Sequence, residues 1–208
     1  MSLLNFFFPR TIRLPDTQFN KNLYINLHGT GEPTLIGNGL IQSGTIMRSI
    51  WRQGMGGLLP YDFEPKKVLL LGLGTGSNAR LISDLYPQSK ITAVEIDPGM
   101  VKIAKKYCRL DKIKNLHLVI GDAYDYVKDL KEDFDLTLVD CFDGKYIPTK
   151  LERLDFYQSL KDHSRYTLAN RLWHAEHIAA SQAFMNSLST KFDFVKHHTR
   201  TNVIISLV

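Results

Sequence analysis

The sequence has little cysteine, no long apolar run and no internal repeat, and each absence narrows the class of protein that it encodes. Its two cysteines, Cys108 and Cys141, are too few for a disulfide framework. This indicates a reducing compartment, and we expect a cytoplasmic protein. The apolar runs are far shorter than the roughly 20 residues of a membrane-spanning helix. Without a period of 20 to 50 residues, solenoid and propeller architectures are also excluded.

The length and composition are those of an ordinary globular protein. A chain of 208 residues with 44% apolar and 23% charged residues forms one domain, or one domain with a small appendage. We predict an N-terminal segment with a hairpin and a helix over residues 1–60, and a main domain over residues 61–208. The apolar start, Met1–Phe8, lacks a basic region and a cleavage site, so we expect it to pack on the body or in a homodimer.

The charge is distributed unevenly along the chain. The net charge is +5, yet residues 121–143 carry eight acidic and only two basic side chains. A uniformly basic surface would favour nucleic acid. A basic body with one acidic segment is instead compatible with a small cationic substrate. The charge pattern thus permits a small cationic partner, and we expect neither a nucleic acid nor a membrane in that role.

The first part of the chain predicts a small β unit followed by a helix. Residues 23–27 alternate between apolar and polar side chains, which is typical of a half-buried strand. Residues 34–42 form a second strand candidate, interrupted by Gly37 and Gly39. Residues 46–56 carry apolar side chains along one helical face. Together they indicate an antiparallel hairpin ahead of the main domain.

From residue 66 onward, predicted strands and helices alternate, which indicates a parallel sheet with helices on both faces. Strands are predicted over residues 68–71, 91–94, 116–120, 136–139 and 166–172. Helices are predicted over residues 77–86, 98–108, 123–130, 151–162 and 175–189. Two final runs, 192–197 and 203–208, are separated by a turn and predict a closing antiparallel hairpin.

Polar groups follow four successive strands of this predicted sheet. The glycine loop Gly72-Leu-Gly-Thr-Gly76 comes after the first strand, and Glu95 ends the second, about 20 residues further on. Asp122 and Asp140 follow the third and fourth strands. The carboxyl ends of parallel strands share one sheet edge, where ligands bind in open α/β folds. The dinucleotide fingerprint has glycine at the position of Ser77, so a nicotinamide cofactor fits less well.

Four segments resemble the class I S-adenosylmethionine-dependent methyltransferase fold: Val68–Gly76, Val94–Pro98, Gly121–Asp122 and Phe134–Asp140. More narrowly, they look like the polyamine aminopropyltransferases, the spermidine and spermine synthases. Leu70 stands where most methyltransferases have an acid, and Val139–Asp143 resembles this family's Asp-x-x-Asp. The resemblance implies an α/β, Rossmann-like fold with a mostly parallel sheet, a closing antiparallel hairpin and a preceding N-terminal β-hairpin unit.

The resemblance implies a pocket for decarboxylated or intact S-adenosylmethionine. Glu95 would hold the ribose, and Asp122 would bind the adenine amino group. The other residues assigned to this pocket are the loop glycines and the neighbours of the two acids: Gly72, Gly74, Gly76, Ile96 and Ala123.

For the amine substrate, the resemblance makes Asp140 the acceptor of a proton from the attacking nitrogen. Asp143 would anchor the polyamine, and Thr75 and Tyr146 are assigned to the same substrate site. This chemistry agrees with the residue types, because a protonated amine cannot attack until a base takes its proton. No metal is expected in it.

The chain departs from the family pattern at several positions. Thr75 stands where the family has an aspartate that meets the aminopropyl amine, and Ser77 where it has a glycine. Met47–Arg52 replaces the family's Tyr-His pair, and Asp143 is followed by Gly144 instead of proline. These changes leave two alternatives open: a methyltransferase of a small molecule or RNA, and a catalytically degenerate relative retained for binding.

Two other chemistries receive less support from the sequence. Cys141 lies beside Asp140, but no histidine neighbours it, and a free cysteine is usually a small buried apolar residue. His174 and His177 have the spacing of a metal-binding pair on a helix, but no cysteine or carboxylate set completes the site.

Overall fold

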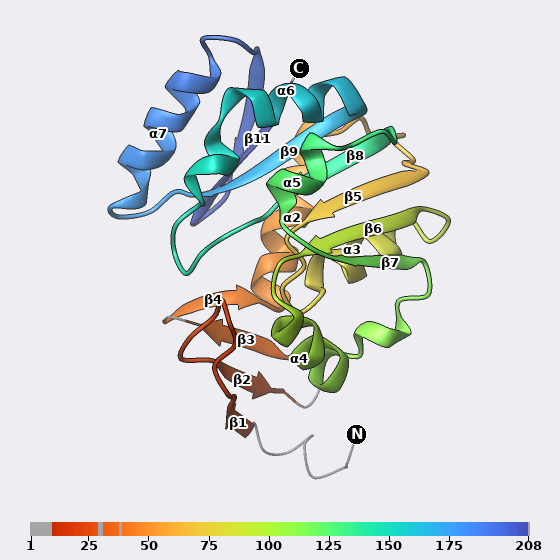
Figure 1. The fold of residues 1–208 in the computed structure, drawn as a ribbon, viewed down its shortest axis with the longest axis vertical. Coiled ribbons are helices and arrows are strands. Elements are labelled where there is room, and N and C mark those ends of the chain that lie inside the picture. Colours follow the sequence, from red (N-terminus) through yellow and green to blue (C-terminus); the bar gives the residue numbers. More distant parts are fainter. Residues whose placement is uncertain (1–9, 29–30, 38, 208) are drawn as a thin grey trace.

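The computed structural model describes residues 10–28, 31–37 and 39–207, and it contains two β-sheets (Figure 1). The apolar start at residues 1–8 lies outside this range. The N-terminal sheet is antiparallel and has the order β1-β2-β3-β4. Its strands are β1 (Arg10–Arg13), β2 (Tyr24–Leu27), β3 (Thr34–Gly37) and β4 (Leu40–Ser43). The predicted hairpin is therefore part of a larger unit, to which the unpredicted β1 contributes an edge strand.

The segment predicted as one interrupted strand over residues 34–42 instead forms both β3 and β4. Gly39 has a φ of 77°, a left-handed conformation that glycine adopts without strain, so the chain can reverse there. β3 and β4 then pair antiparallel, with Gly37 opposite Leu40.

The second sheet has seven strands in the order β10-β11-β9-β8-β5-β6-β7. Its strands are β5 (Lys67–Leu71), β6 (Lys90–Glu95), β7 (Leu116–Ile120), β8 (Phe134–Val139), β9 (Ser164–Leu172), β10 (Phe194–His198) and β11 (Asn202–Leu207). Strands β5 to β9 pair in parallel, and β11 pairs antiparallel with both β9 and β10. This is the predicted Rossmann-like arrangement with a closing antiparallel hairpin.

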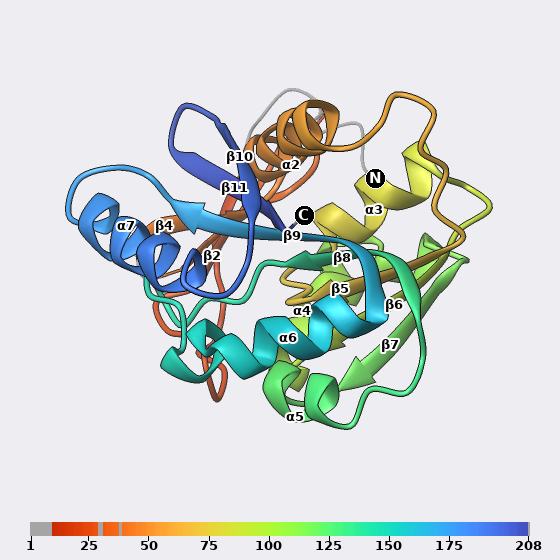
Figure 2. The same cartoon turned by 90° about the horizontal axis from the view of Figure 1, so that it is seen from above.

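Helices cover both faces of the seven-stranded sheet, because its central strands are apolar on both sides. In β5, Val68 and Leu70 belong to one core cluster, and Leu69 and Leu71 belong to the other. Figure 2 shows α2 and α3 on one side of the sheet and α5 and α6 on the other. The helices are α2 (Thr45–Leu58), α3 (Ser77–Leu85), α4 (Pro98–Cys108), α5 (Ala123–Lys128), α6 (Leu154–His163) and α7 (His177–Leu188). None of the helices in the described ranges is long and apolar enough to cross a membrane.

Helix α2 joins the N-terminal sheet to the core of the main domain. Trp51 is completely buried, and Ile50 and Met55 are buried beside it in the cluster that contains Val68. Gly54 lies so close to β11 that a Cβ there would approach Ile204 Cγ1 to 2.6 Å. The boundary at residue 60 stays a prediction, and α2 packs tightly against elements on its other side.

Two details of the helices bear on the sequence predictions. Asp97 caps α4 as expected: its Oδ1 accepts hydrogen bonds from Gly99 N at 2.9 Å and Met100 N at 3.3 Å. Its Oδ2 accepts from Asn20 Nδ2 at 2.7 Å, which ties the N-terminal unit to this helix. The helix predicted over 151–162 instead begins at Leu154, after a separate 3₁₀ turn, η2 (Thr149–Glu152).

Candidate active site

A cleft of about 660 Å³ lies between the N-terminal unit and the carboxyl ends of the central strands. One wall comes from β4 and α2, and the other comes from the segments that follow β5, β6, β7 and β8. Its size is that of a small-molecule site. Gly72, Glu95, Asp122 and Asp140 all line this cleft, so the predicted convergence of four strand ends is observed.

The glycine loop forms the floor of the cleft and requires glycine for a steric reason. Gly72 has a φ of 87°, and a Cβ there would stand 2.3 Å from the carbonyl oxygen of Asp140. Gly72 N donates to Val94 O at 2.9 Å, so the loop is held between β6 and the end of β8. Gly74 also lines the cleft, whereas Gly76, with a φ of 86°, is the N-cap of α3 and is absent from the cleft lining. The backbone therefore lies open to a ligand at this turn.

Glu95 is buried at the end of β6 and holds the glycine loop in place. Its Oε2 accepts hydrogen bonds from Leu73 N and Gly74 N, both at 3.0 Å, and its Oε1 accepts from Asp97 N at 2.9 Å. Burial raises the pKa of Glu95, although these three backbone donors oppose the shift. The carboxylate keeps lone pairs toward the cleft that it lines, where ribose hydroxyls can donate.

Asp122 begins α5 and has a partner that the sequence did not reveal. Its Oδ1 caps the helix by accepting from Tyr124 N at 2.9 Å, while its Oδ2 forms an ion pair with Lys150. Burial acts to raise the pKa of Asp122, but the Lys150 ammonium and the backbone donors outweigh it and lower the pKa. Ile96 and Ala123 line the cleft next to the two acids, as assigned.

Asp140, at the end of β8, is held by three uncharged N–H donors. Asn78 Nδ2 donates to Oδ2 at 2.7 Å, Trp51 Nε1 donates to the same oxygen at 2.9 Å, and Asn170 Nδ2 donates to Oδ1 at 2.8 Å. Burial raises the pKa of Asp140, and the three donors partly offset this rise. No cation pairs with the carboxylate among the described residues, so an incoming ammonium would meet an uncompensated charge.

Asp143 and Tyr146 lie further out, on a turn closed by backbone bonds between them. Asp143 N donates to Tyr146 O at 2.8 Å, and Tyr146 N donates to Asp143 O at 3.1 Å. Asp143 is exposed and lines the cleft. Tyr146 is 61% exposed, is absent from the cleft lining and packs edge-on toward His177, with ring centroids 6.1 Å apart.

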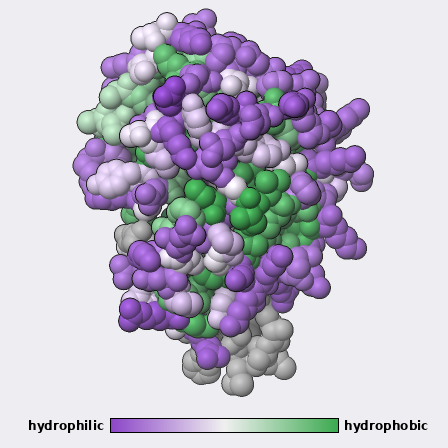
Figure 3. Space-filling model, viewed as in Figure 1, coloured by the Kyte–Doolittle hydropathy of each residue, from purple (hydrophilic) through white to green (hydrophobic). Residues whose placement is uncertain are grey.

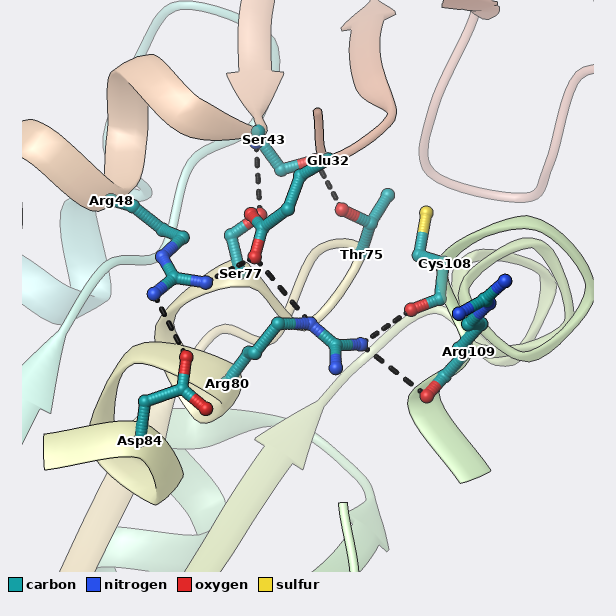
Figure 4. A network of polar contacts seen from close by, with 10 residues as sticks. Glu32, Ser43, Arg48, Thr75, Ser77, Arg80, Asp84, Cys108 and Arg109 are labelled. Atoms are coloured by element: carbon teal, nitrogen blue, oxygen red, sulfur yellow. Dashed lines mark hydrogen bonds and ion pairs between the residues drawn. The ribbon is translucent and has the colours of Figure 1, made fainter. Parts of the chain in front are cut away.

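Thr75 points to the other side of the glycine loop, away from the cleft lining. It is 2% exposed, and its hydroxyl lies 2.5 Å from Ser43 Oγ (Figure 4). It lines a second cavity of about 370 Å³, together with Glu32, Arg48 and Arg80. The structure thus brings Asp140 and Asp143 to the cleft but does not bring Thr75 or Tyr146 there.

The mouth of the cleft has a marked apolar wall. Ile41 is 40% exposed and Ile46 is 53% exposed, and both line the cleft beside Met47. Figure 3 shows hydrophobic surface at mid-height on one face of the molecule, at the level of the junction between the two sheets. This side of the cleft therefore offers apolar contacts to a substrate.

The sequence interpretation missed four residues around the acids: Trp51, Asn78, Lys150 and Asn170. One signal was available, since Asn170 lies at alternate spacing with Leu168 and Leu172, on an otherwise apolar face of its strand. Such a residue needs a buried partner. Trp51 and Lys150 gave no comparable signal, because their contacts depend on how distant segments pack.

Two minor alternatives can be placed in the structure. Burial, together with the charges of Glu95 and Asp140, raises the pKa of the Cys141 thiol well above its ordinary value, which disfavours a thiolate nucleophile. Across residues 10–28, 31–37 and 39–207, no three His, Cys, Asp or Glu side chains are grouped to hold a metal.

The seven-stranded sheet, the glycine loop and the strand-end acids define a Rossmann-like protein of the class I methyltransferase fold. A spermidine synthase structure in complex with the transition-state analogue AdoDATO superposes with a TM-score of 0.75 at 18% identity, over 96% of this chain and 73% of that one. The sequence profile of the spermine/spermidine synthase domain matches residues 55–166, more than half of the chain. The chain belongs to this family, which confirms the resemblance seen in its motifs.

Curated relatives extend the similarity beyond the profile. The polyamine aminopropyltransferase of Vibrio vulnificus is 37% identical over 113 residues, which cover 53% of this chain and 38% of the relative. That of Sulfurisphaera tokodaii is 30% identical over 191 residues, covering 87% of this chain and 61% of the relative. The chain therefore spans between about two fifths and three fifths of the length of these relatives.

Proposed function

We propose that the chain transfers an aminopropyl group from decarboxylated S-adenosylmethionine to a polyamine. The observation that carries the proposal is Asp140, a carboxylate with no cationic partner among the described residues, held by three neutral donors beside the glycine loop. The names of the family relatives support the same reaction.

The residues of the cleft fit the nucleoside of this donor. Gly72 keeps the backbone free of side chains where a ligand approaches, and Glu95 offers a buried carboxylate to ribose hydroxyls. Asp122 lies at the next strand end, where it can accept from the adenine amino group, and Ile96 supplies an apolar contact. Lys150 forms an ion pair with the same Asp122 carboxylate, so an adenine amino group that binds Asp122 would share this carboxylate with Lys150.

When bound, the donor supplies a carbon activated by an adjacent sulfonium, which leaves as a neutral thioether. Asp140 takes one proton from the ammonium of the acceptor. The freed nitrogen lone pair then forms the C–N bond as the C–S bond breaks, and Asp140 releases its proton to solvent. Beyond this proton transfer, the cleft contributes by aligning nitrogen, carbon and sulfur.

Asp143 is the proposed anchor for a second ammonium of the acceptor. It lines the outer part of the cleft, and among the described residues its carboxylate has no hydrogen-bond or ion-pair partner. Tyr146, further out on the same turn, is proposed to contact longer amines only. Thr75, which the sequence assigned to the substrate site, can contact the substrate only if the glycine loop changes its conformation.

The test is mass spectrometry of the nucleoside product, with both donors offered to the protein alongside a panel of polyamines. We expect methylthioadenosine together with an aminopropylated amine. Asp140→Asn should lower turnover by roughly 10²- to 10⁴-fold, because a positioned base contributes about that much, while nucleoside binding remains. Full turnover in this variant would remove the proposed base.

A second candidate function is methyl transfer from intact S-adenosylmethionine. The position of Thr75 favours it, since no acid of the glycine loop faces the cleft to select an aminopropyl ammonium or to repel a donor carboxylate. The same measurement separates the two, because methyl transfer yields S-adenosylhomocysteine. Absence of both products, with donor binding confirmed, would point to a relative that only binds.

We also propose a homodimer in the cytoplasm, where the two free cysteines stay reduced. Gel filtration of a chain that lacks residues 1–19 tests whether the apolar start contributes to assembly. An unchanged elution volume would contradict that contribution.

A further inference from the structure

Asn78 has one end of its amide group engaged and the other without a partner. It lies in the first turn of α3, directly after the glycine loop, and is only 6% exposed while lining the cleft. Its Nδ2 donates to Asp140 Oδ2 at 2.7 Å. Its Oδ1 is buried and accepts no hydrogen bond from any part of the chain that the structure describes.

The orientation of this amide is fixed by chemistry. An ionised carboxylate only accepts hydrogen bonds, so the NH₂ group of Asn78 must face Asp140 and its carbonyl oxygen must face elsewhere. Buried carbonyl oxygens normally have a donor, because burial removes the water that would otherwise supply one. Because Asn78 lines the cleft, a ligand or a water bound there can supply the donor that Asn78 Oδ1 lacks.

We propose that Asn78 Oδ1 binds the attacking amine together with Asp140. This inference rests on the proposed aminopropyl transfer and assigns a further substrate contact within it. The amine must reach Asp140 to give up its proton, and the two polar ends of one amide are adjacent, so the same nitrogen comes within reach of Asn78 Oδ1. A primary ammonium has three N–H donors, enough for both acceptors.

An uncharged second acceptor suits the reaction better than another acid. A second carboxylate would stabilise the ammonium form and oppose the loss of the proton that must precede attack. The amide oxygen of Asn78 accepts an N–H from the ammonium and from the free amine alike. It orients the nitrogen while leaving the negative charge, and hence the proton, to Asp140.

Asn170 and Trp51 provide matched controls. Each also donates one N–H to Asp140, but Asn170 Oδ1 already accepts from Asn202 Nδ2 at 2.9 Å, and an indole has no acceptor oxygen. Asn78→Ala, Asn170→Ala and Trp51→Phe therefore each remove one hydrogen bond to the carboxylate. Only Asn78→Ala also removes an acceptor that has no partner, the amide oxygen Oδ1.

The experiment measures binding of 1,4-diaminobutane to the complex with methylthioadenosine by titration calorimetry, after thermal melts confirm that each variant is folded. We expect Asn78→Ala to weaken amine binding about ten-fold more than Trp51→Phe or Asn170→Ala, with methylthioadenosine binding within about two-fold of wild type. Equal weakening in all three variants would overturn the proposal, because Asn78 would then act only through Asp140.

This readout is separate from the test of the proposed function. If the wild type forms no methylthioadenosine with any amine, the transfer reaction is refuted. Amine binding in the non-reactive complex would still show whether Asn78 contacts the amine.

Discussion

At the scale of single residues, the chemistry depends on how a buried carboxylate is kept ionised. Burial raises the pKa of Asp140, and the three donors Trp51, Asn78 and Asn170 act against this rise. A carboxylate that serves as base is active only in its charged form. Activity should therefore be present above the pKa of Asp140 and should fall as the pH drops through it.

Trp51→Phe should move the acidic limb of the pH–rate profile upward. The change keeps the ring but removes the indole N–H, and a lost hydrogen bond of this kind corresponds to about half to one pH unit. The measurement is kcat/KM against pH, with Trp173→Phe as a control because Trp173 has no contact to Asp140. An unshifted limb in Trp51→Phe would show that the indole does not hold the base.

Restoring the family's acid at position 75 should not restore its contact. Thr75 is buried behind the loop against Ser43, so Thr75→Asp would bury a carboxylate beside Arg48 and Arg80, which already pair with Glu32. We expect a loss of about 2–4 kcal/mol in the free energy of unfolding, together with no gain in aminopropyl transfer. Urea denaturation and the product assay check this, and higher turnover would place the side chain in the cleft.

At the scale of elements, the glycine loop contains a glycine that the backbone requires, whereas helix α2 contains one that it does not require. Gly72 is needed because its backbone is left-handed and touches Asp140 O, whereas Gly56 lies in α2 with open space where a Cβ would be. The same substitution should therefore have opposite signs at the two positions.

Gly72→Ala should destabilise the protein by about 2–5 kcal/mol, because the left-handed backbone and the overlap with Asp140 both oppose a Cβ. Gly56→Ala should stabilise it by about 0.5–1 kcal/mol through the lower entropy of the unfolded chain. Urea midpoints measure both changes. A Gly72→Ala protein as stable as wild type would contradict the geometry of the loop.

The sequence predicted elements well where one local pattern decides them. The apolar run of β5 and the Asp97-Pro98 start of α4 fell where expected, because burial on both faces and helix capping are encoded within a few residues. β1 was missed, since a short strand carrying Arg10 and Arg13 has no apolar alternation. The donors to Asp140 were missed because α2, α3 and β9 meet only through long-range packing.

At the scale of the whole molecule, polar contacts hold the N-terminal unit against the main domain. Arg48 in α2 pairs with Glu32, which precedes β3, and with Asp84 in α3, while Arg80 approaches the same Glu32 at 3.5 Å (Figure 4). Arg48, Glu32 and Arg80 are partly buried, whereas Asp84 is exposed. They fix the wall formed by β4 and α2 relative to the glycine loop.

Arg48→Ala should lower the free energy of unfolding by roughly 1 kcal/mol, a value between those of exposed and buried ion pairs, because Arg48 is partly exposed. It should also raise KM for the acceptor, since the wall loses its support. Lys67→Ala, which removes the exposed pair with Glu132, is the control and should leave the urea midpoint unchanged. Equal effects of the two changes would argue against a role in positioning.

The packing of α2 against β11 also has a consequence for biosynthesis. The surface that covers Gly54 belongs to Ile204, about 150 residues later in the chain, so α2 is made well before β11. During translation, the face of α2 at Gly54 therefore stays uncovered until β11 leaves the ribosome. The cleft, which Thr201 and Asn202 also line, is completed only when β11 is in place. Until then the nascent chain exposes this apolar face to chaperones and to misassembly.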